Sequence, residues 1–206
     1  MVELRIVENL YRWKVEEYRE RVEKKLENEI YVTELLLCPL KSRLAKQYPE
    51  LALSRVFDPP LFIGDMVHRG LQQTLKEIFG EENVEVEVEV EREVVVDGQS
   101  YVIRGRIDAV IGDTVVEIKS GRSDVGIPHK HHVDQLRLYM WMRGAAKGLL
   151  LYVTNDRITE YPVEQPMSDG EVMDLVRSFL KGEPAPRYPW ECNYCPFAVV
   201  CPRRVR

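Results

Sequence analysis

An alternating run near the middle of the chain constrains its fold most strongly. Residues 84–96 read VEVEVEVEREVVV, so valine and glutamate alternate over most of the run. Successive side chains of a β-strand point to opposite faces, and this pattern predicts a long strand with one buried face and one solvated row of glutamates. DGQS at 97–100 then predicts a turn into YVIRGRIDAVIG, and GD at 112–113 predicts another into TVVEIKS. The middle of the chain should therefore form a three-stranded meander.

Helical patterns flank the meander on both sides. We expect helices over residues 3–29, 33–37 and 64–79 before it, and over about 131–143 after it. The strands GLLLYVTND and ITEYPV and the helix SDGEVMDLVRSFLKG follow. This order predicts an α/β protein of the α+β type, with a mixed sheet flanked by helices. A length of 206 residues suits one domain with appendages.

Two strands of the meander carry polar residues that could form a site. Asp108 alternates with the apolar Ile107, and Glu117 and Lys119 share one face of the next strand. If these strands pair through the tight turn, Asp108, Glu117 and Lys119 converge on one side of the hairpin. Two carboxylates and an ammonium could bind a hard divalent cation and hold a water or phosphate, as phosphodiester hydrolysis requires. The alternative is that Glu117 and Lys119 decorate a solvated face.

Neighbouring helices could add to this site. Gln135 and Tyr139 are four residues apart and therefore share one face of the helix after the meander. His68 lies in the otherwise amphipathic helix before it, where a structural role through local hydrogen bonds is the alternative to metal ligation. The run HKHH at 129–132 should lie in a flexible loop entering the later helix, where its basic charge would suit phosphates; ligation of a second metal is the alternative.

Four cysteines lie on either side of this region. Cys38 is upstream, and Cys192, Cys195 and Cys201 form a C-x2-C-x5-C run downstream. The first residues lack a secretory signal and no apolar run approaches the span of a bilayer, so we expect a cytoplasmic protein with reduced thiols and no membrane partner. Four thiolates suit a [4Fe–4S] or [2Fe–2S] cluster or zinc, and the spacing does not separate these. Bound this way they would staple the two ends of the domain together; four unrelated buried cysteines are the alternative.

The charge of the chain limits how it can meet nucleic acid. A formal net charge of −5 argues against coating nucleic acid by bulk electrostatics but is compatible with a local basic groove. The charged fraction of 31%, rich in Glu and Arg with few Asn or Gln, is typical of thermophilic proteins. No G-x4-G-K-[ST] run is present, so ATP-driven unwinding is not encoded by that route.

Short motifs along the chain, taken together, resemble those of a known nuclease group. GRID at 105–108, EIK at 117–119, QLRLY at 135–139 and GDMVH at 64–68 resemble the motifs of the PD-(D/E)XK nuclease superfamily in its RecB-like branch. With the cysteines added, the chain from about Thr33 to Cys201 resembles the CRISPR-associated RecB-like iron–sulfur exonucleases, the fourth Cas family. One departure is that Ile107 precedes Asp108 where the motif has proline.

The resemblance implies a restriction-endonuclease-like core and a role for each candidate residue. The implied ligands of Mg²⁺ or Mn²⁺ are Asp108, Glu117, the Ile118 carbonyl and His68. Lys119 would position the attacking water, and Gln135 and Tyr139 would orient the scissile strand. The implied ligands of an iron–sulfur staple, [4Fe–4S] in preference to [2Fe–2S] or zinc, are Cys38, Cys192, Cys195 and Cys201.

The resemblance also implies a domain plan and a function. Residues 1–32 would form an N-terminal helix, 33–191 the RecB-like nuclease domain, and 192–206 a cysteine segment that closes the cluster site with Cys38. The implied activity is a divalent-metal-dependent exonuclease that trims single-stranded DNA 5′ to 3′ for CRISPR spacer acquisition beside the integrase proteins. The alternatives are a DNA-end-binding subunit that cuts little and a repair nuclease coupled to a helicase. The long N-terminal helix is compatible with a homo-oligomer.

Overall fold

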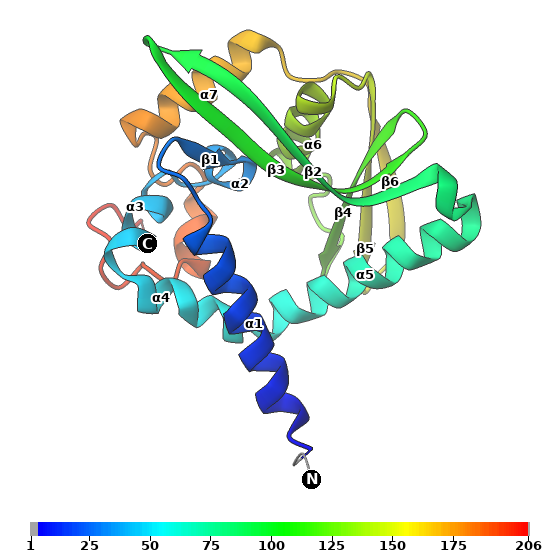
Figure 1. The fold of residues 1–206 in the computed structure, drawn as a ribbon. Coiled ribbons are helices and arrows are strands. Elements are labelled where there is room, and N and C mark those ends of the chain that lie inside the picture. Colours follow the sequence, from blue (N-terminus) through cyan, green and yellow to red (C-terminus); the bar gives the residue numbers. More distant parts are fainter. Residues whose placement is uncertain (1–3, 206) are drawn as a thin grey trace.

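One six-stranded mixed sheet organises the fold, and helices cover both of its faces (Figure 1). The computed structural model describes residues 4–205; residues 1–3 and 206, at the ends of the expected first and last segments, lie outside the described residues. The helices are α1 (Ile6–Glu23), α2 (Val32–Leu36), α3 (Leu40–Gln47), α4 (Pro49–Ser54), α5 (Pro59–Phe79), α6 (Lys130–Arg143) and α7 (Asp169–Lys181), with the 3-10 helices η1 (Arg55–Phe57), η2 (Glu81–Asn83) and η3 (Pro189–Tyr194). The strands are β1 (Glu29–Tyr31), β2 (Val84–Val96), β3 (Gln99–Ile111), β4 (Thr114–Gly121), β5 (Lys147–Thr154) and β6 (Ile158–Val163). The predicted mixed sheet flanked by helices is confirmed.

β3 is the central strand and pairs with three others. β2 runs antiparallel to β3 along its length, from Val84 opposite Ile111 to Val96 opposite Gln99. On its other edge β3 pairs in parallel with β1 and then, at its far end, antiparallel with β4. β5 lies parallel to β4, and β6 lies antiparallel to β5. The predicted meander is present as β2, β3 and β4.

A gap separates β1 from β4 along the edge of β3. β1 pairs with residues 102–104 of β3 and β4 pairs with residues 109–111, so residues 105–108 pair with neither strand. The gap arises because β4 leaves β3 after Val116 and continues alongside β5. Polar side chains in this gap can therefore lie inside the fold without entering either hydrophobic core.

The two faces of the sheet pack against different helices. Val115 belongs to the larger core, which includes residues of α6 and α7. Val116 and Ile118 belong to a smaller core with Leu71 and Leu75 of α5. Neighbouring residues of a strand point to opposite faces, so β4 contributes to both cores. The sheet is thus held between α5 on one side and α6 and α7 on the other.

Several helix boundaries differ from the predicted ones. α5 begins at Pro59 rather than residue 64, because proline suits the first turn of a helix, where the N–H lacks an intrahelical partner. It ends at Phe79 as predicted, and Gly80 follows with a φ of 89° that favours glycine. α1 ends at Glu23 rather than residue 29, since Glu29 already begins β1. The last helix is confirmed, and its N-cap Ser168 forms a capping box with Glu171.

Two helices absent from the sequence-based prediction support the end of the chain. Leu44 of α3 and Ala52 of α4 form a small core with Phe197, against which Cys195 and Cys201 pack. Figure 1 accordingly shows the C-terminus beside α3 and α4. The upstream helices and the downstream cysteine segment therefore fold as one unit.

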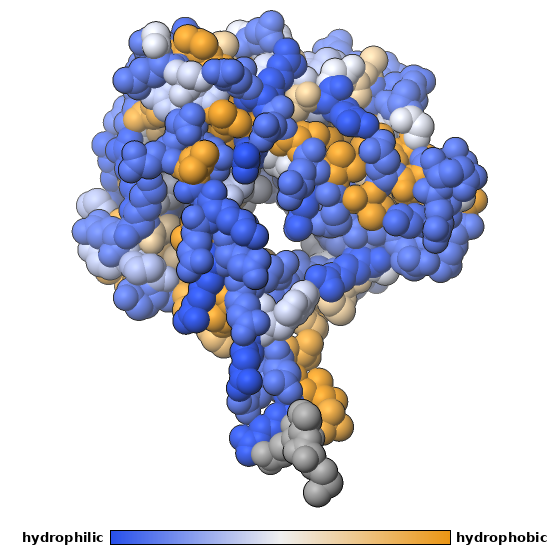
Figure 2. Space-filling model, viewed as in Figure 1, coloured by the Kyte–Doolittle hydropathy of each residue, from blue (hydrophilic) through white to orange (hydrophobic). Residues whose placement is uncertain are grey.

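The surface view shows an opening through the molecule (Figure 2). The opening lies between α1, α5 and the β2–β3 hairpin, and hydrophilic residues make up most of its border in this view. α1 projects from the body, and none of its residues is buried. Among residues 4–205, no helix combines the length and apolar character needed to cross a bilayer.

Candidate active site

Asp108 lies where β3 and β4 separate. The last residues paired between these strands are Ala109 and Val116, so Asp108 and Glu117 stand one step beyond the end of the ladder. There the Ile118 N–H donates a hydrogen bond to Asp108 Oδ2 over 2.8 Å. The side chain of Asp108 thus replaces a backbone partner and is fixed against β4.

Glu117 is a buried carboxylate, with only 2% of its surface exposed. Its Oε1 accepts a hydrogen bond from Lys119 Nζ over 2.6 Å, whereas the buried Oε2 has no hydrogen-bond partner among the described residues. Burial raises the pKa of Glu117 to about 7; the nearby charge of Lys119 opposes this shift and that of Asp108 adds to it. A buried oxygen without a partner is costly, and a divalent cation would satisfy it. The donor set at the gap therefore fits a hard metal ion.

His68 reaches the same carboxylates from α5. Its Nδ1 lies 3.3 Å from Asp108 Oδ1, the oxygen that Ile118 leaves free. Burial alone would lower the pKa of His68, but the hydrogen bond and charge of Asp108 raise it overall. The pairing with Asp108 favours the protonated form of His68. To bind a metal ion, His68 would have to be neutral.

Lys119 connects the carboxylates to α6. Lys119 Nζ donates to Gln135 Oε1 over 3.0 Å as well as to Glu117. Tyr139, one helical turn after Gln135, is 4% exposed, and Gln135 and the Arg106 backbone are close enough to its hydroxyl to affect its pKa. Burial raises the pKa of Tyr139, so its hydroxyl stays protonated.

Gly105 allows Tyr139 to enter the gap in the sheet. A Cβ on Gly105 would lie 2.4 Å from Tyr139 Cε1 and 2.9 Å from Val32 Cγ2. No side chain larger than hydrogen fits there without moving the tyrosine ring. Gly105 is thus required by the close approach of Tyr139 to β3.

The structure brings together every residue predicted for the catalytic site. They come from α5, β3, β4 and α6: His68, Asp108, Glu117, Ile118, Lys119, Gln135 and Tyr139. In residues 4–205, however, no three histidine, cysteine or carboxylate side chains are arranged closely enough to form a ready-made metal site. The roles of these residues in binding metal and substrate therefore remain predictions.

The four cysteines line one cavity beside α3. This cavity is small, with a volume of about 20 Å³, and its lining includes Cys38, Cys192, Cys195 and Cys201. All four are free thiols, and burial raises the pKa of Cys38 and Cys195. The thiols share a cavity without converging into a formed metal site within the described part of the chain. The expected iron–sulfur staple stays a prediction.

Comparison with known proteins places the chain in a family. The model of the PD-(D/E)XK nuclease superfamily matches residues 8–202. The CRISPR-associated exonuclease Cas4 of Saccharolobus solfataricus is 43% identical over 205 residues, covering 97% of this chain and 99% of that protein. The crystal structure of SSO0001 superimposes with a TM-score of 0.92 at 43% identity, covering 98% of both chains. An alkaline exonuclease from Laribacter hongkongensis gives a TM-score of 0.47 at 11% identity, covering 85% of this chain and 90% of that one.

The chain belongs to the Cas4 family of the PD-(D/E)XK nuclease superfamily. The resemblance read from the motifs is confirmed. The expected enzyme class, a nuclease and hence a hydrolase, is confirmed with it. The superfamily model reaches residue 202 of this Cas4 homologue, so the family assignment includes all four cysteines as well as the core.

Two polar residues that the sequence analysis missed support Asp108. Gln72 of α5 is 5% exposed, and its Nε2 donates to the Asp108 carbonyl over 2.9 Å and to Glu87 Oε1 over 2.6 Å. Glu87 Oε2 also lies 2.7 Å from Arg106 Nε. Glu87 therefore does more than form part of a solvated row. A buried glutamine on the apolar side of α5 was the available signal.

Glu87 and Asp108 also mark the point where the strand faces exchange. Ile107 and Val88 contact the larger core, whereas Ala109 and Val86, only two residues away, contact the smaller one. Residues two apart normally share a face. The exchange coincides with the left-handed φ of 52° at Glu87 and with the absence of a Glu87–Asp108 pair from the ladder. Alternation alone would place Ile103, Ile107 and Ile111 on one core face, but Ile103 and Ile107 lie in the larger core and Ile111 packs against the smaller one.

Glu191 ties the two halves of the cysteine cavity together. It is 1% exposed, and its Oε1 accepts from the Cys38 N–H at 2.7 Å and from Lys41 Nζ at 3.2 Å. Its Oε2 accepts from the N–H groups of Arg187 and Tyr188 at 3.0 and 2.9 Å. The residue next to Cys192 thus binds the backbone of Cys38 directly. Sequence patterns do not single out Glu191, for which adjacency to a cysteine is the available signal.

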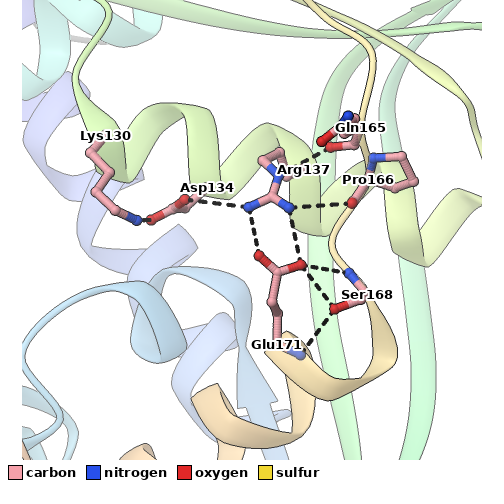
Figure 3. Close-up of polar contacts among 7 residues, drawn as sticks. All are labelled: Lys130, Asp134, Arg137, Gln165, Pro166, Ser168 and Glu171. Carbon is pink, nitrogen blue, oxygen red and sulfur yellow. Dashed lines mark hydrogen bonds and ion pairs between the residues drawn. The ribbon is translucent and has the colours of Figure 1, made fainter.

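A polar network on the outer side of α6 fixes the helix that carries Gln135 and Tyr139 (Figure 3). Arg137 Nε donates to the Gln165 carbonyl over 3.0 Å, and Arg137 Nη1 lies 2.9 Å from Glu171 Oε1 at the start of α7. Figure 3 shows that the ion pairs continue from Arg137 to Asp134 and from Asp134 to Lys130. The network joins α6 to α7 and so fixes the position of the helix that carries Gln135 and Tyr139.

The histidine run differs from the expected flexible, basic loop. His131 and His132 lie in the first turn of α6, and His132 Nδ1 is 2.8 Å from the Tyr152 hydroxyl. Burial, with the charge of Lys119 as a further cause, lowers the pKa of His131 to about 4 and that of His132 to about 2. Both rings are neutral at neutral pH, so the expectation of added positive charge is wrong for these two residues.

Proposed function

We propose that this protein is a divalent-metal-dependent exonuclease that shortens single-stranded DNA. The observation that carries the proposal is the buried, partnerless oxygen of Glu117 beside Asp108 and Lys119. A buried carboxylate oxygen without a partner destabilises the fold unless a ligand binds it. The simplest ligand is a hard cation together with a phosphate. The name of the Cas4 relative, a CRISPR-associated exonuclease, supports the same activity.

The proposed mechanism assigns each residue a task. Asp108, Glu117, the Ile118 carbonyl and His68 would hold Mg²⁺ or Mn²⁺, which polarises a phosphate and lowers the pKa of a bound water. Lys119 Nζ, held between Glu117 and Gln135, would hold the attacking water in line with the phosphorus. Gln135 and Tyr139 would contact the scissile strand from α6. The hydrophilic opening beside α5 supports entry of a free single strand.

The polarity and the biological role rest on family membership. By analogy with Cas4, the proposed direction is 5′ to 3′ and the proposed role is trimming DNA ends for spacer acquisition with the CRISPR integrase proteins. In this plan residues 33–191 are the nuclease domain, residues 1–32 an N-terminal helix that could also join copies of the chain, and residues 192–206 the closing segment.

We further propose that the four cysteines hold an iron–sulfur cluster, [4Fe–4S] rather than [2Fe–2S] or zinc. Support comes from the shared cavity and from Glu191, which joins its two halves. Iron, acid-labile sulfide and zinc contents of protein purified without oxygen, together with its visible absorbance, separate the three. Zinc without sulfide would overturn the proposal.

The nuclease is tested with single-stranded DNA labelled at either the 5′ or the 3′ end. Wild type, Glu117→Ala and the exposed control Glu89→Ala are compared with Mg²⁺, with Mn²⁺ and with EDTA. We expect cutting by wild type and control that requires metal, disappears in Glu117→Ala, and releases the 5′ label first. Cutting that survives Glu117→Ala would refute the site. Tight binding of DNA ends without any cutting by wild type would instead support an end-binding subunit.

A further inference from the structure

A group of stacked rings continues the active site toward the cysteine segment. The ring centroids of His131 and Trp190 are 4.9 Å apart, and those of His131 and Tyr188 are 5.5 Å apart. Tyr188 and Trp190 are stacked at 5.9 Å with an interplanar angle of 16°, and His129 stacks on His131 at 5.6 Å with the same angle. We call His131, Tyr188 and Trp190 the ring platform.

The ring platform is aligned with the proposed catalytic residues. His131, Gln135 and Tyr139 follow one another at four-residue spacing on α6, so they lie in a row along one face of the helix. Lys119, which bonds Gln135, is close enough to affect the titration of His131. His131 therefore places the platform in the same row, one helical turn before Gln135.

The platform is both accessible and rigid. Trp190 is 40% exposed although tryptophan is a large apolar residue, and Tyr188 and His131 are partly exposed. The next residue, Glu191, fixes this segment through the backbone of Cys38, Arg187 and Tyr188. An exposed aromatic surface held in one conformation binds a flat partner with little loss of conformational entropy.

We propose that the ring platform stacks a base of the single-stranded DNA next to the scissile phosphate. This inference rests on the proposed nuclease function and adds a substrate-binding subsite to it. Every nucleobase has a flat π-face, so stacking on Trp190 suits an exonuclease that must accept all sequences. Two of the three rings, Tyr188 and Trp190, come from the residues just before the cysteine segment, so this stretch of the chain would take a direct part in binding DNA.

The test is a scan of single abasic nucleotides along a short single strand, with binding measured by anisotropy in EDTA so that nothing is cut. Wild type, Trp190→Ala, Trp190→Phe and the control Tyr194→Ala are compared; Tyr194 is an exposed aromatic of the same η3 segment outside the platform. Wild type should lose affinity about 5- to 100-fold at one or two adjacent positions. Trp190→Ala should bind intact DNA correspondingly more weakly and be insensitive to the abasic site at those positions.

The controls separate stacking from a structural defect. Trp190→Phe and Tyr194→Ala should keep the position-specific loss, and the salt dependence of binding should be unchanged in Trp190→Ala because no phosphate contact is removed. A flat abasic profile in wild type, or the same profile in Trp190→Ala, would overturn the platform while leaving the nuclease intact. Absence of both binding and cutting by wild type would instead overturn the proposed function, and the platform with it.

Discussion

Replacing Glu191 tests how the two ends of the chain are held together. Its two carboxylate oxygens accept from three backbone N–H groups and one ammonium, on either side of the cysteine cavity. Glu191→Ala leaves these donors without an acceptor in a site where the side chain is 1% exposed. Glu191→Gln keeps one oxygen but turns an NH₂ group toward N–H donors at the other position.

The expected loss is large because the interactions are buried and charged. Breaking a buried, charge-assisted network lowers the free energy of unfolding by about 3–5 kcal/mol, which is the loss expected for Glu191→Ala. Glu191→Gln should show roughly half of that loss or more. For a protein of this size each kcal/mol corresponds to about 2–4 °C in Tm, so Glu191→Ala should melt roughly 6–20 °C lower.

The assay is thermal and urea unfolding of the reduced, metal-free protein, so that bound metal does not mask the effect. Glu183→Gln is the matched control, because Glu183 is an exposed glutamate nearby that pairs with Arg203. It should change stability by less than about 1 kcal/mol. A loss of under about 1 kcal/mol in Glu191→Ala would refute the reasoning that Glu191 joins the two halves. Reconstituted Glu191→Ala should also retain less iron than wild type.

Three further perturbations follow from the geometry of the gap and of α6. Gly105→Ala places a Cβ 2.4 Å from Tyr139 Cε1, and we expect a loss of about 1–3 kcal/mol in urea unfolding and at least about tenfold in cutting rate; normal cutting would show that the ring can move freely. In EDTA, Glu117→Gln should become more stable than wild type as pH rises. Folding raises the pKa of Glu117 from 4.5 to about 7, because the buried carboxyl is favoured in its neutral form. The stabilisation that wild type gains from the neutral carboxyl is therefore complete below pH 4.5. Wild type loses up to about 3 kcal/mol of its free energy of unfolding as the pH rises through 7. Urea midpoints at low and high pH measure this, and parallel pH profiles for the two proteins would contradict it. Arg137→Met should cost about 1–2 kcal/mol by removing the bonds to Gln165 and Glu171, and should weaken cutting through looser placement of α6; unchanged urea midpoints would argue against that role.

The meander and the convergence of the candidate site residues were predictable because their signals are local. A period of two over residues 84–96 can only be satisfied by a strand, and the short turns fix which strand follows. Glu117 and Lys119 share a face by the same rule, and Gln135 and Tyr139 share one by the helical rule. The pairing through Gly112 then brings these local patterns together.

The missed features depend on contacts between distant segments. Gly105 is small because Tyr139 reaches it across the fold, and Glu191 is buried because Cys38 donates to it from far upstream. The exchange of faces at Asp108 needs the left-handed backbone of Glu87, which an alternating sequence conceals. α3 and α4 were missed although each starts at a proline: Pro39 is the N-cap of α3, and Pro49 begins α4, where proline suits the first turn.

The neutral histidines show the same limitation in electrostatic form. Composition assigns His131 a partial positive charge, but burial, with the charges of His129 and Lys119, lowers its pKa to about 4. Neither burial nor the approach of a charge from another strand is readable from the run HKHH. Only with the fold in hand does the run become part of an aromatic surface.

The most direct test of the central claim is to count bound Mn²⁺ by electron paramagnetic resonance and to measure cutting of single-stranded DNA on the same samples. The comparison is between wild type, Asp108→Asn and Glu89→Gln, the last being an exposed glutamate of β2, which pairs with the edge of β3 opposite the gap. We predict that wild type and Glu89→Gln bind Mn²⁺ and cut, and that Asp108→Asn loses both together. Full Mn²⁺ binding and cutting by Asp108→Asn would contradict a metal-dependent nuclease site at the separation of β3 and β4.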